Sequence, residues 1–296
     1  MSNLLPAADT RTQAPFARIA VVGFGLIGGS VALAVRERWP STHIIAVDRR
    51  DVIETALRMH AADVGADDLV MAADAELVVL AAPVRTNIRL LTALGEHIPG
   101  NALVTDVGST KREMVAAARG LPARLRFVGG HPLAGSATGG VAAARPDLFV
   151  GRPWILTPAD ESGEADVAAL TLFISALGAA PRRLTPDAHD DLVAYLSHLP
   201  QLVVSALMHV VGAHAGEAGL TLAGRGLRDT TRLASSPADV WRDIAATNPD
   251  HIGRALDDLI AVLRRMRSDP GGTAMDDTFG SAAEWKRALE RVSEGT

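Results

Sequence analysis

Two short polar segments contain side chains that could transfer a proton. One is Asp-Val-Gly-Ser-Thr-Lys at residues 106–111, and the other is Gly-Gly-His-Pro-Leu-Ala-Gly at residues 129–135. Because imidazole ordinarily titrates near neutral pH, His131 could accept the proton of a hydroxyl group as a carbinol becomes a carbonyl. Ser109 is a candidate hydrogen-bonding partner for it. The residues alone leave open that Gly-Gly-His-Pro is a glycine turn with a surface histidine.

The second half of the chain contains side chains that suit an anionic substrate. Ser-His-Leu-Pro-Gln at residues 197–201 lies inside a long apolar run, where the proline should kink a helix and turn polar groups such as His198 towards a cavity. Residues 224–232 include three arginines, and a guanidinium binds a carboxylate through two hydrogen bonds. The alternatives are a structural histidine in the core and a solvated loop with a local ion pair.

A glycine-rich stretch near the N-terminus predicts a binding site for a dinucleotide. The apolar run 19–22 predicts a buried strand, Gly-Phe-Gly-Leu-Ile-Gly follows at 23–28, and helical periodicity begins at 27–39. In this order the first glycine permits a tight turn, the second lets the backbone approach a pyrophosphate, and the third lets the helix pack against the strand. The pyrophosphate would lie at the N-terminus of the helix. The predicted contacts are Gly23, Gly25, Leu26, Ile27 and Gly28.

Asp48 directly follows the second predicted strand, residues 43–47, and lies 20 positions after Gly28. A carboxylate at this place can accept both hydroxyl groups of the adenosine ribose and repels a 2′-phosphate, which favours NAD over NADP. Arg49 and Arg50 leave NADP open, because a guanidinium beside the ribose accommodates that phosphate.

Alternating strand and helix patterns must position these groups. The alternation predicts an α/β fold, a Rossmann-type doubly wound parallel sheet followed by an all-helical C-terminal domain. Ligands of such sheets bind outside the carboxyl ends of the strands, where both polar segments begin. We expect a disordered tail at 1–17, a dinucleotide-binding domain at 18–185, and a helical substrate-binding and dimerisation domain at 186–296.

The expected elements follow from hydrophobic periodicity and from proline and glycine positions. Further strands are expected at 77–82, 102–106, 125–128 and 150–156. Helices are expected at 52–60, 86–97, 110–119, 164–177, 237–246, 249–267 and 275–292, with an interrupted helical run at 190–211.

Composition and charge exclude several classes of function. The 296 residues are 48% hydrophobic and carry a net charge of −5 that is spread along the chain, so we expect no nucleic-acid partner. The absence of cysteine excludes disulfides, thiol catalysis and cysteine metal sites, and it suits a cytoplasmic protein; we expect no metal. We also expect no membrane helix, since no apolar run approaches the ~20 residues that a membrane-spanning helix needs.

Five segments occur in one order along the chain, and this ordered set identifies a family more specifically than any single segment does. They are Gly-Phe-Gly-Leu-Ile-Gly-Gly-Ser at 23–30, Asp-Val-Gly-Ser-Thr-Lys at 106–111, Gly-Gly-His-Pro-Leu-Ala-Gly at 129–135, Ser-His-Leu-Pro at 197–200 and Arg-Asp-Thr-Thr-Arg at 228–232. Together they resemble the prephenate/arogenate dehydrogenase family of tyrosine biosynthesis, over roughly residues 18–292.

The resemblance implies oxidative decarboxylation of prephenate to 4-hydroxyphenylpyruvate, with release of CO2 and reduction of NAD. By the same resemblance, His131 deprotonates the ring hydroxyl, and Ser109 orients His131 and the nicotinamide. His198 contacts the substrate and Arg232 binds one of its carboxylates. Many members have histidine where this chain has Gln201. A neutral amide at that place favours the keto group of prephenate over the ammonium group of arogenate.

Other functions stay open at this point. The chain could be an arogenate or a dual-specificity cyclohexadienyl dehydrogenase. A β-hydroxyacid-type NAD(P) dehydrogenase would use a lysine of the helical domain, but after Lys111 the chain has only Lys286, in the final predicted helix. A non-catalytic dinucleotide-binding protein would need neither His131 nor Arg232. The several apolar faces of the helical domain predict a homodimer.

Overall fold

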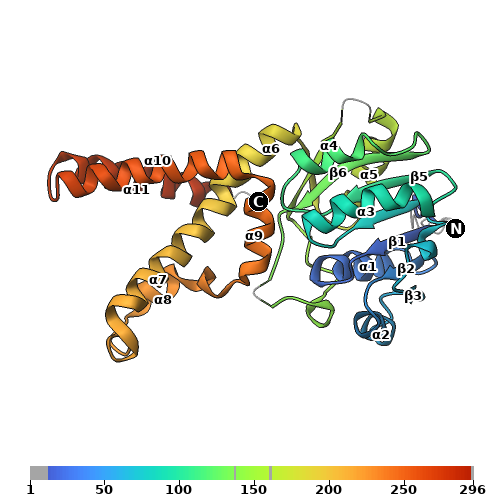
Figure 1. Ribbon diagram of the computed structural model, residues 1–296, viewed down its shortest axis with the longest axis horizontal. Coiled ribbons are helices and arrows are strands. Elements are labelled where there is room, and N and C mark those ends of the chain that lie inside the picture. Colours follow the sequence, from blue (N-terminus) through green and yellow to red (C-terminus); the bar gives the residue numbers. More distant parts are fainter. Residues whose placement is uncertain (1–12, 137, 160–161, 295–296) are drawn as a thin grey trace, which may run out of the picture. The chain divides into compact units, whose positions relative to one another are not determined.

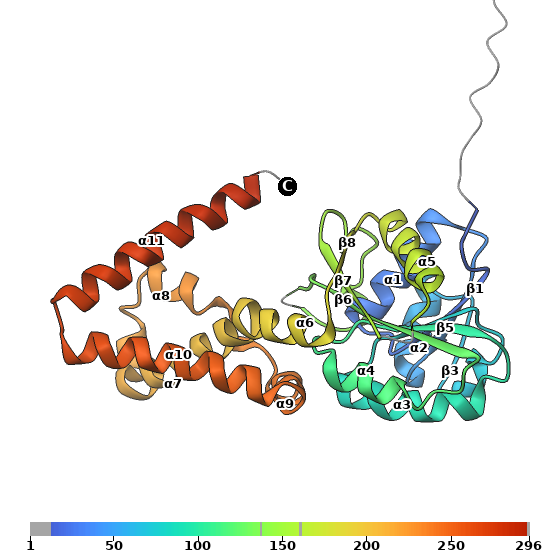
Figure 2. The ribbon, with the colours of Figure 1, turned by 90° about the horizontal axis from the view of Figure 1, so that it is seen from above.

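The computed structural model describes residues 13–136, 138–159 and 162–294 (Figures 1 and 2). Most of the tail expected at 1–17 lies outside the described residues. The chain divides into two compact units, which we call the sheet unit and the helical unit. The sheet unit comprises the chain up to Ala82, Thr86–Gly108 and Ala117–Arg183. The helical unit comprises Pro83–Arg85, Ser109–Ala116 and the chain from Leu184 onwards.

The sheet unit is built on one eight-stranded sheet within the described residues, in the order β3-β2-β1-β4-β5-β6-β7-β8. The order reverses between β1 and β4, which is the doubly wound Rossmann topology that the sequence predicts. The strands are β1 Arg18–Val22, β2 His43–Val47, β3 Val64–Ala66, β4 Leu77–Leu80, β5 Ala102–Asp106, β6 Leu125–Pro132, β7 Pro153–Pro158 and β8 Ala180–Arg183.

The central strands β1 and β4 are almost entirely apolar because helices cover both faces of the sheet. In β1, Ile19 pairs with Ile44 on one side and with Leu77 on the other, and all three side chains are buried. Helices α1 and α5 cover one face and α3 covers the other (Figure 2). The bounds are α1 Leu26–Arg38, α2 Arg50–Arg58, α3 Val84–His97, α4 Arg112–Ala118 and α5 Glu164–Ala176, with 3-10 turns η1 Leu69–Ala72 and η2 Val141–Ala143.

The strand β6 is longer than the sequence predicts. We expected a strand at 125–128 and left open a glycine turn directly after it, but β6 continues to Pro132 because its second half pairs with β7. A Cβ at Gly130 would lie 2.5 Å from the carbonyl oxygen of Asp106. Glycine is therefore needed there for close packing and not for a turn, and the alternative of a glycine turn is wrong. His131 lies inside a strand, opposite Ile155.

The strand β7 runs antiparallel to β6, so the sheet is mostly parallel and not wholly parallel as expected. A parallel pair needs a crossover connection, usually a helix. The described part of the link from β6 to β7 contains only the short turn η2, whereas α5 connects β7 to β8 and these two strands are parallel.

The helical unit contains most of the C-terminal elements that the sequence predicts, with two additions. Residues 224–232 form a short helix and a 3-10 turn in place of the solvated loop considered above. The elements are α6 Pro186–Val193, η3 Ala194–His198, α7 Leu199–Leu220, α8 Arg225–Thr230, η4 Arg232–Ser235, α9 Ala238–Thr247, α10 Pro249–Ser268 and α11 Thr273–Glu294.

The interruption expected near Pro200 is present, in the form of a π-helical turn. This turn, η3, separates α6 from α7, and Pro200 lies in the first turn of α7. A proline is tolerated there because the first N–H groups of a helix have no partner inside it. A second break occurs at Gly216, where the backbone of α7 is not helical (φ 61°, ψ 179°).

The stretch Pro186–Leu220 contradicts the expectation that no apolar run is long enough to span a membrane. This helical stretch is the one candidate for a membrane span among the described residues. Its most apolar 18-residue window has a mean hydropathy of 1.3, and 11% of that window is buried. The expectation was wrong because the helical stretch continues through Pro200, where the sequence indicated an interruption. Length and composition alone are weak evidence for a membrane span, since core helices pass the same test.

Candidate functional site

The glycine turn between β1 and α1 assigns a distinct steric role to each of its three glycines. Gly23 has a φ of +92°, and a Cβ there would lie 2.4 Å from the main-chain nitrogen of Ala82. A Cβ at Gly28 would lie 2.1 Å from the carbonyl oxygen of Gly23. A Cβ at Gly25, in contrast, would meet no atom of the described chain within 4 Å. Turn and helix packing therefore require the first and third glycines, and the second leaves open space.

That open space lies at the N-terminus of α1, which suits a phosphate. Gly25 precedes the helix in an extended conformation, and Leu26 and Ile27 form its first turn. No acidic residue occurs in this turn, so the partial positive charge of the unpaired N–H groups is not neutralised locally. The residues fit the pyrophosphate of a dinucleotide, which binds at helix N-termini of this kind.

Asp48 connects the end of β2 to the glycine turn. Its Oδ2 accepts the N–H of Phe24 at 2.6 Å, and its Oδ1 accepts the N–H of Arg49 at 2.6 Å. A carboxylate has about four lone-pair sites, so it can also accept ribose hydroxyls. The guanidinium of Arg49 is 80% exposed, 3.8 Å from Asp51, and Arg50 forms an ion pair along its own helix. Both arginines therefore have acidic partners of their own.

Asp106 is a functional candidate that the sequence did not single out. Its side chain is fully buried at the end of β5. Oδ2 accepts the N–H of Gly108 at 2.8 Å, and Oδ1 accepts the N–H of Gly130 at 3.1 Å. These glycines directly precede Ser109 and His131 in the sequence. One buried carboxylate thus fixes the backbone next to each predicted proton-transfer residue. An acid at a strand end, followed two residues later by glycine, was the available signal.

The two predicted proton-transfer residues belong to different units. His131 is partly buried in β6 of the sheet unit. Ser109 is partly buried too, but its segment groups with the helical unit, although it follows β5 directly in sequence. No residue pattern predicts this division.

His198 is a buried imidazole without partners in the described part of the chain. It lies in η3, only 1% exposed, and neither ring nitrogen has a hydrogen-bond partner there. Burial lowers its pKa to about 4, so the ring is neutral at pH 7. Its ring contacts Trp241 edge-on, with 6.2 Å between centroids. Buried polar atoms nearly always have partners, so these two nitrogens mark a place where a ligand could supply them.

Gln201 supports the turn that carries Arg232. The Gln201 side chain is 4% exposed, and its Nε2 donates to the carbonyl of Leu233 at 2.8 Å and to Ser205 at 3.1 Å. Its Oε1 accepts from Ser236 at 3.1 Å. The amide therefore joins α7 to both ends of η4.

Arg232 begins η4 and is exposed. The alternative of a structural pair with Asp229 finds no support, because no ion pair to Arg232 occurs among the described residues. A guanidinium that is anchored at its backbone and unpaired at its end can bind a carboxylate through two hydrogen bonds.

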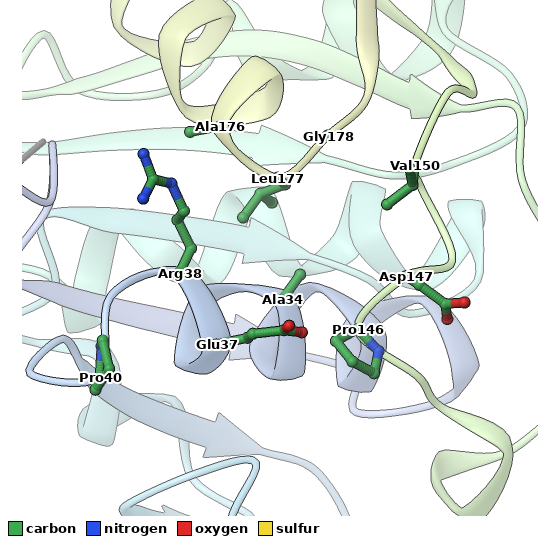
Figure 3. A pocket seen from close by; sticks show the side chains of 10 residues that line it. All are labelled: Ala34, Glu37, Arg38, Pro40, Pro146, Asp147, Val150, Ala176, Leu177 and Gly178. Carbon is green, nitrogen blue, oxygen red and sulfur yellow. The ribbon is translucent and has the colours of Figure 1, made fainter. Parts of the chain in front are cut away.

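The sheet unit also has a surface pocket that these residues do not line. It has a volume of about 600 Å³ and lies between the ends of α1 and α5 and the segment 146–150. Figure 3 shows Leu177 and Ala34 at its centre, with the charged groups of Arg38, Glu37 and Asp147 around them. The predicted dinucleotide contacts are not among its lining residues.

Comparison with known proteins agrees with both units. The model of the prephenate dehydrogenase nucleotide-binding domain matches residues 31–181, and that of the prephenate dehydrogenase dimerization domain matches residues 185–270. A prephenate dehydrogenase of Bacillus subtilis is 37% identical over 258 residues, which are 84% of this chain and 69% of the relative.

Two solved structures share the fold over nearly the whole chain. Synechocystis arogenate dehydrogenase is 30% identical with a TM-score of 0.72, and the match covers 93% of this chain and 97% of that one. A prephenate dehydrogenase from A. aeolicus, in complex with hydroxyphenyl propionate and NAD+, is 26% identical with a TM-score of 0.82, over 93% and 96% of the two chains. The Rossmann-type fold and the resemblance carried by the five segments are both confirmed. This chain belongs to the prephenate dehydrogenase family.

Proposed function

We propose that this protein oxidises prephenate to 4-hydroxyphenylpyruvate and CO2, with NAD as the hydride acceptor. The observation that carries the proposal is the glycine turn, whose second glycine leaves open space at the N-terminus of α1 beside Asp48. It occurs in a chain whose two halves both match the prephenate dehydrogenase family. His198 and Arg232 add an imidazole and a guanidinium that have no partner among the described residues, and these groups suit a substrate with two carboxylates.

His131 acts as the base in this proposal. It accepts the proton of the ring hydroxyl as the carbinol carbon becomes a carbonyl. NAD, when bound, supplies the acceptor for the hydride that leaves this carbon. The bond to the ring carboxylate breaks, CO2 is released, and its electron pair completes the aromatic ring as a phenolate. His131 can return the proton to this phenolate, which gives the hydroxyl group of the product. Aromatisation drives the step, so the protein mainly has to position the groups and accept one proton. Ser109 orients His131, and Asp106 holds the backbone beside both residues.

Substrate binding falls to the helical unit. Arg232 binds one carboxylate of prephenate, and His198 contributes a neutral imidazole that can both donate and accept a hydrogen bond. Gln201 acts on the substrate through the turn that it holds, and its neutral side chain offers no counter-charge to an ammonium group. Prephenate is therefore the preferred substrate.

Arogenate is the second candidate, because the Synechocystis relative is an arogenate dehydrogenase. The test is to offer prephenate and arogenate separately to the purified protein with NAD and to follow the absorbance of the reduced cofactor. Faster turnover of prephenate is expected. Faster turnover of arogenate would reverse the assignment, and no turnover of either would reject it.

Asp48 sets the preference for NAD over NADP in this proposal. The guanidinium groups of Arg49 and Arg50 have acidic partners, so they do not form a phosphate site by themselves. Replacing Asp48 by Ser should move the ratio of kcat/KM values towards NADP by about tenfold. An unchanged ratio would show that the two arginines decide the choice.

We propose that the enzyme is a cytoplasmic homodimer that associates through the helical unit. The matched family model is described as a dimerization domain, and α7 exposes apolar side chains such as Val210, which is 64% exposed. Leu196 of η3 and Leu222, two residues after α7, are also 66% and 88% exposed. Large apolar side chains that are exposed along one stretch of chain suit an interface with a partner. Sedimentation equilibrium should give twice the chain mass. A monomer at micromolar concentration, or recovery of the protein with membranes, would contradict this.

A further inference from the structure

The segment Ser109–Ala116 follows β5 of the sheet unit in sequence but belongs to the helical unit by its contacts. Thr110 is 1% exposed, and its Oγ1 lies 2.7 Å from Oγ1 of Thr247, the last residue of α9. Arg112, the first residue of α4, donates from Nη1 to Oδ2 of Asp250 in α10 at 2.8 Å. Side chains of α9 and α10 therefore hold this segment.

A third helix supplies a buried carboxylate to the same segment. Asp190 of α6 is fully buried, and its Oδ1 and Oδ2 accept the N–H groups of Lys111 and Arg112 at 2.7 and 2.9 Å. Nδ1 of His189 lies 2.7 Å from Oδ1. The first N–H groups of a helix have no partner inside it. For α4 this partner comes from a residue 78 positions later in the chain.

Burying a carboxylate is costly unless hydrogen bonds satisfy its oxygens. Two adjacent amides at the start of α4 donate to the carboxylate of Asp190. The carboxylate therefore fixes the first turn of α4 as well as the packing of α4 against α6. Side-chain oxygens that accept amides at the start of a helix define where the helix begins and how the chain enters it. Ser109 lies just two residues before the first of these amides.

We propose that Asp190 is a positioning residue of this dehydrogenase. It holds the Ser109 segment in the frame of the helical unit, which also carries His198 and Arg232, so that the orienting hydroxyl and the substrate-binding side chains are fixed to one body. The inference rests on the role proposed for Ser109. Asp190 touches neither substrate nor cofactor and acts through the main chain of residues 111 and 112.

A double-mutant cycle tests the proposal with prephenate and NAD. Asp190→Asn keeps one acceptor oxygen but turns an NH2 group towards an N–H donor. It should lower kcat by about tenfold to a hundredfold, since small misplacements of reacting groups have effects of this size. In a Ser109→Ala background the same change should lower kcat less than about threefold, because the group that it positions is gone. The affinity for NAD should stay unchanged.

Equal losses of kcat in both backgrounds would overturn the proposal and leave the role of Ser109 intact. If Ser109→Ala alone has no effect, the proposed role of Ser109 is wrong and the inference about Asp190 falls with it. Thr247→Val loosens the same segment through Thr110 and repeats the test if Asp190→Asn does not fold. It should show a smaller loss with the same dependence on Ser109. The matched control is Asp191→Asn, whose carboxylate is 45% exposed and pairs with Arg254; it should leave kcat unchanged.

Discussion

The glycine turn of the sheet unit and the Arg232 end of the helical unit, which are the two proposed binding sites, are built by different means. In the turn, main-chain geometry makes the site, with a positive φ at Gly23 and open space beside Gly25. At the other end, the proposed site consists of side chains, and long-range contacts hold the turn that carries Arg232, such as the hydrogen bonds between Gln201 and both Leu233 and Ser236. A site made of backbone tolerates few substitutions, and its conformation depends mainly on residues close to it in sequence. A site made of side chains depends on the tertiary structure around it.

The two units also differ in how well they bury their own apolar surface. The main core cluster of the sheet unit extends from β1 through α1 to α5. One core cluster of the helical unit contains four buried residues of the described chain, with six partly buried neighbours. These four are Ala194, Ile244, Ile252 and Ala255. A small core of this kind adds little stability, so we expect the helical unit to rely on association for part of its stability.

Among the substitutions in the two units, we expect the replacement of His131 to have the largest effect on catalysis. Replacing His131 by Asn removes the proposed base and should lower kcat by about 10²–10⁴-fold. KM for prephenate and the affinity for NAD should change little, because neither the helical unit nor the glycine turn is altered. A large rise in KM with unchanged kcat would show that His131 binds the substrate, and the chemistry would have to be assigned elsewhere.

Arg232 should produce the opposite kinetic pattern. Arg232→Gln removes a charge-assisted contact to a carboxylate and should raise KM for prephenate by about tenfold to a hundredfold, with a smaller change in kcat. The matched control is Arg242→Gln, an exposed arginine on α9 of the same unit. If both variants raise KM equally, the effect comes from the overall charge of the unit and not from a specific contact.

Two glycines of one turn should separate binding from folding. Gly25 has a φ of −77° and open space beside it, so Gly25→Ala should leave the Tm unchanged and weaken NAD binding by about tenfold. Gly28→Ala forces a Cβ against the carbonyl of Gly23 and should lower the Tm. Calorimetric titration and thermal unfolding measure the two quantities. A Gly25→Ala variant that binds NAD normally would place the pyrophosphate elsewhere.

His198 should make the stability of the protein depend on pH. Its pKa is about 4 in the folded protein and near 6.5 when the ring is in water. Between these pH values the unfolded chain takes up a proton on His198 that the folded protein does not. The free energy of unfolding therefore falls as the pH is lowered from 6.5 towards 4. Between pH 7 and 4.5 the wild type should lose about 2 to 3 kcal/mol more free energy of unfolding than His198→Gln.

Urea titrations at the two pH values measure this difference. His209→Gln, on the exposed side of α7, is the control and should behave like the wild type. Equal losses in the wild type and His198→Gln would mean that His198 is more accessible to water than its 1% exposure indicates.

Local patterns predicted the parts of the fold that depend on neighbours in sequence. The glycine turn, the spaced Asp48 and the order of strands and helices in the sheet unit all follow from residues within one or two turns of chain. The short edge strands β3 and β8 were missed, since three or four residues give no periodicity to detect. The second half of β6 was missed because it depends on pairing with β7, a strand that lies a long loop away.

The same reasoning explains what could be seen of the candidate site. Residue types and order were sufficient to choose His131, His198 and Arg232. They were not sufficient to find Asp190, which acts on residues 78 and 79 positions earlier, or to show that the Gln201 amide is engaged by the turn at Leu233. Contacts of this range leave no trace in a single sequence.

The chain passes between the two units more than once, and this limits how the protein could have been assembled from parts. A fragment that begins at Leu184 would lack Ser109–Ala116, which the helical unit includes. It would leave the buried oxygens of Asp190 without two amide donors. The helical part is therefore not an exchangeable module. A cut near 184 would separate Asp190 from the two amides that it accepts, so the part after 184 should not fold as an independent unit.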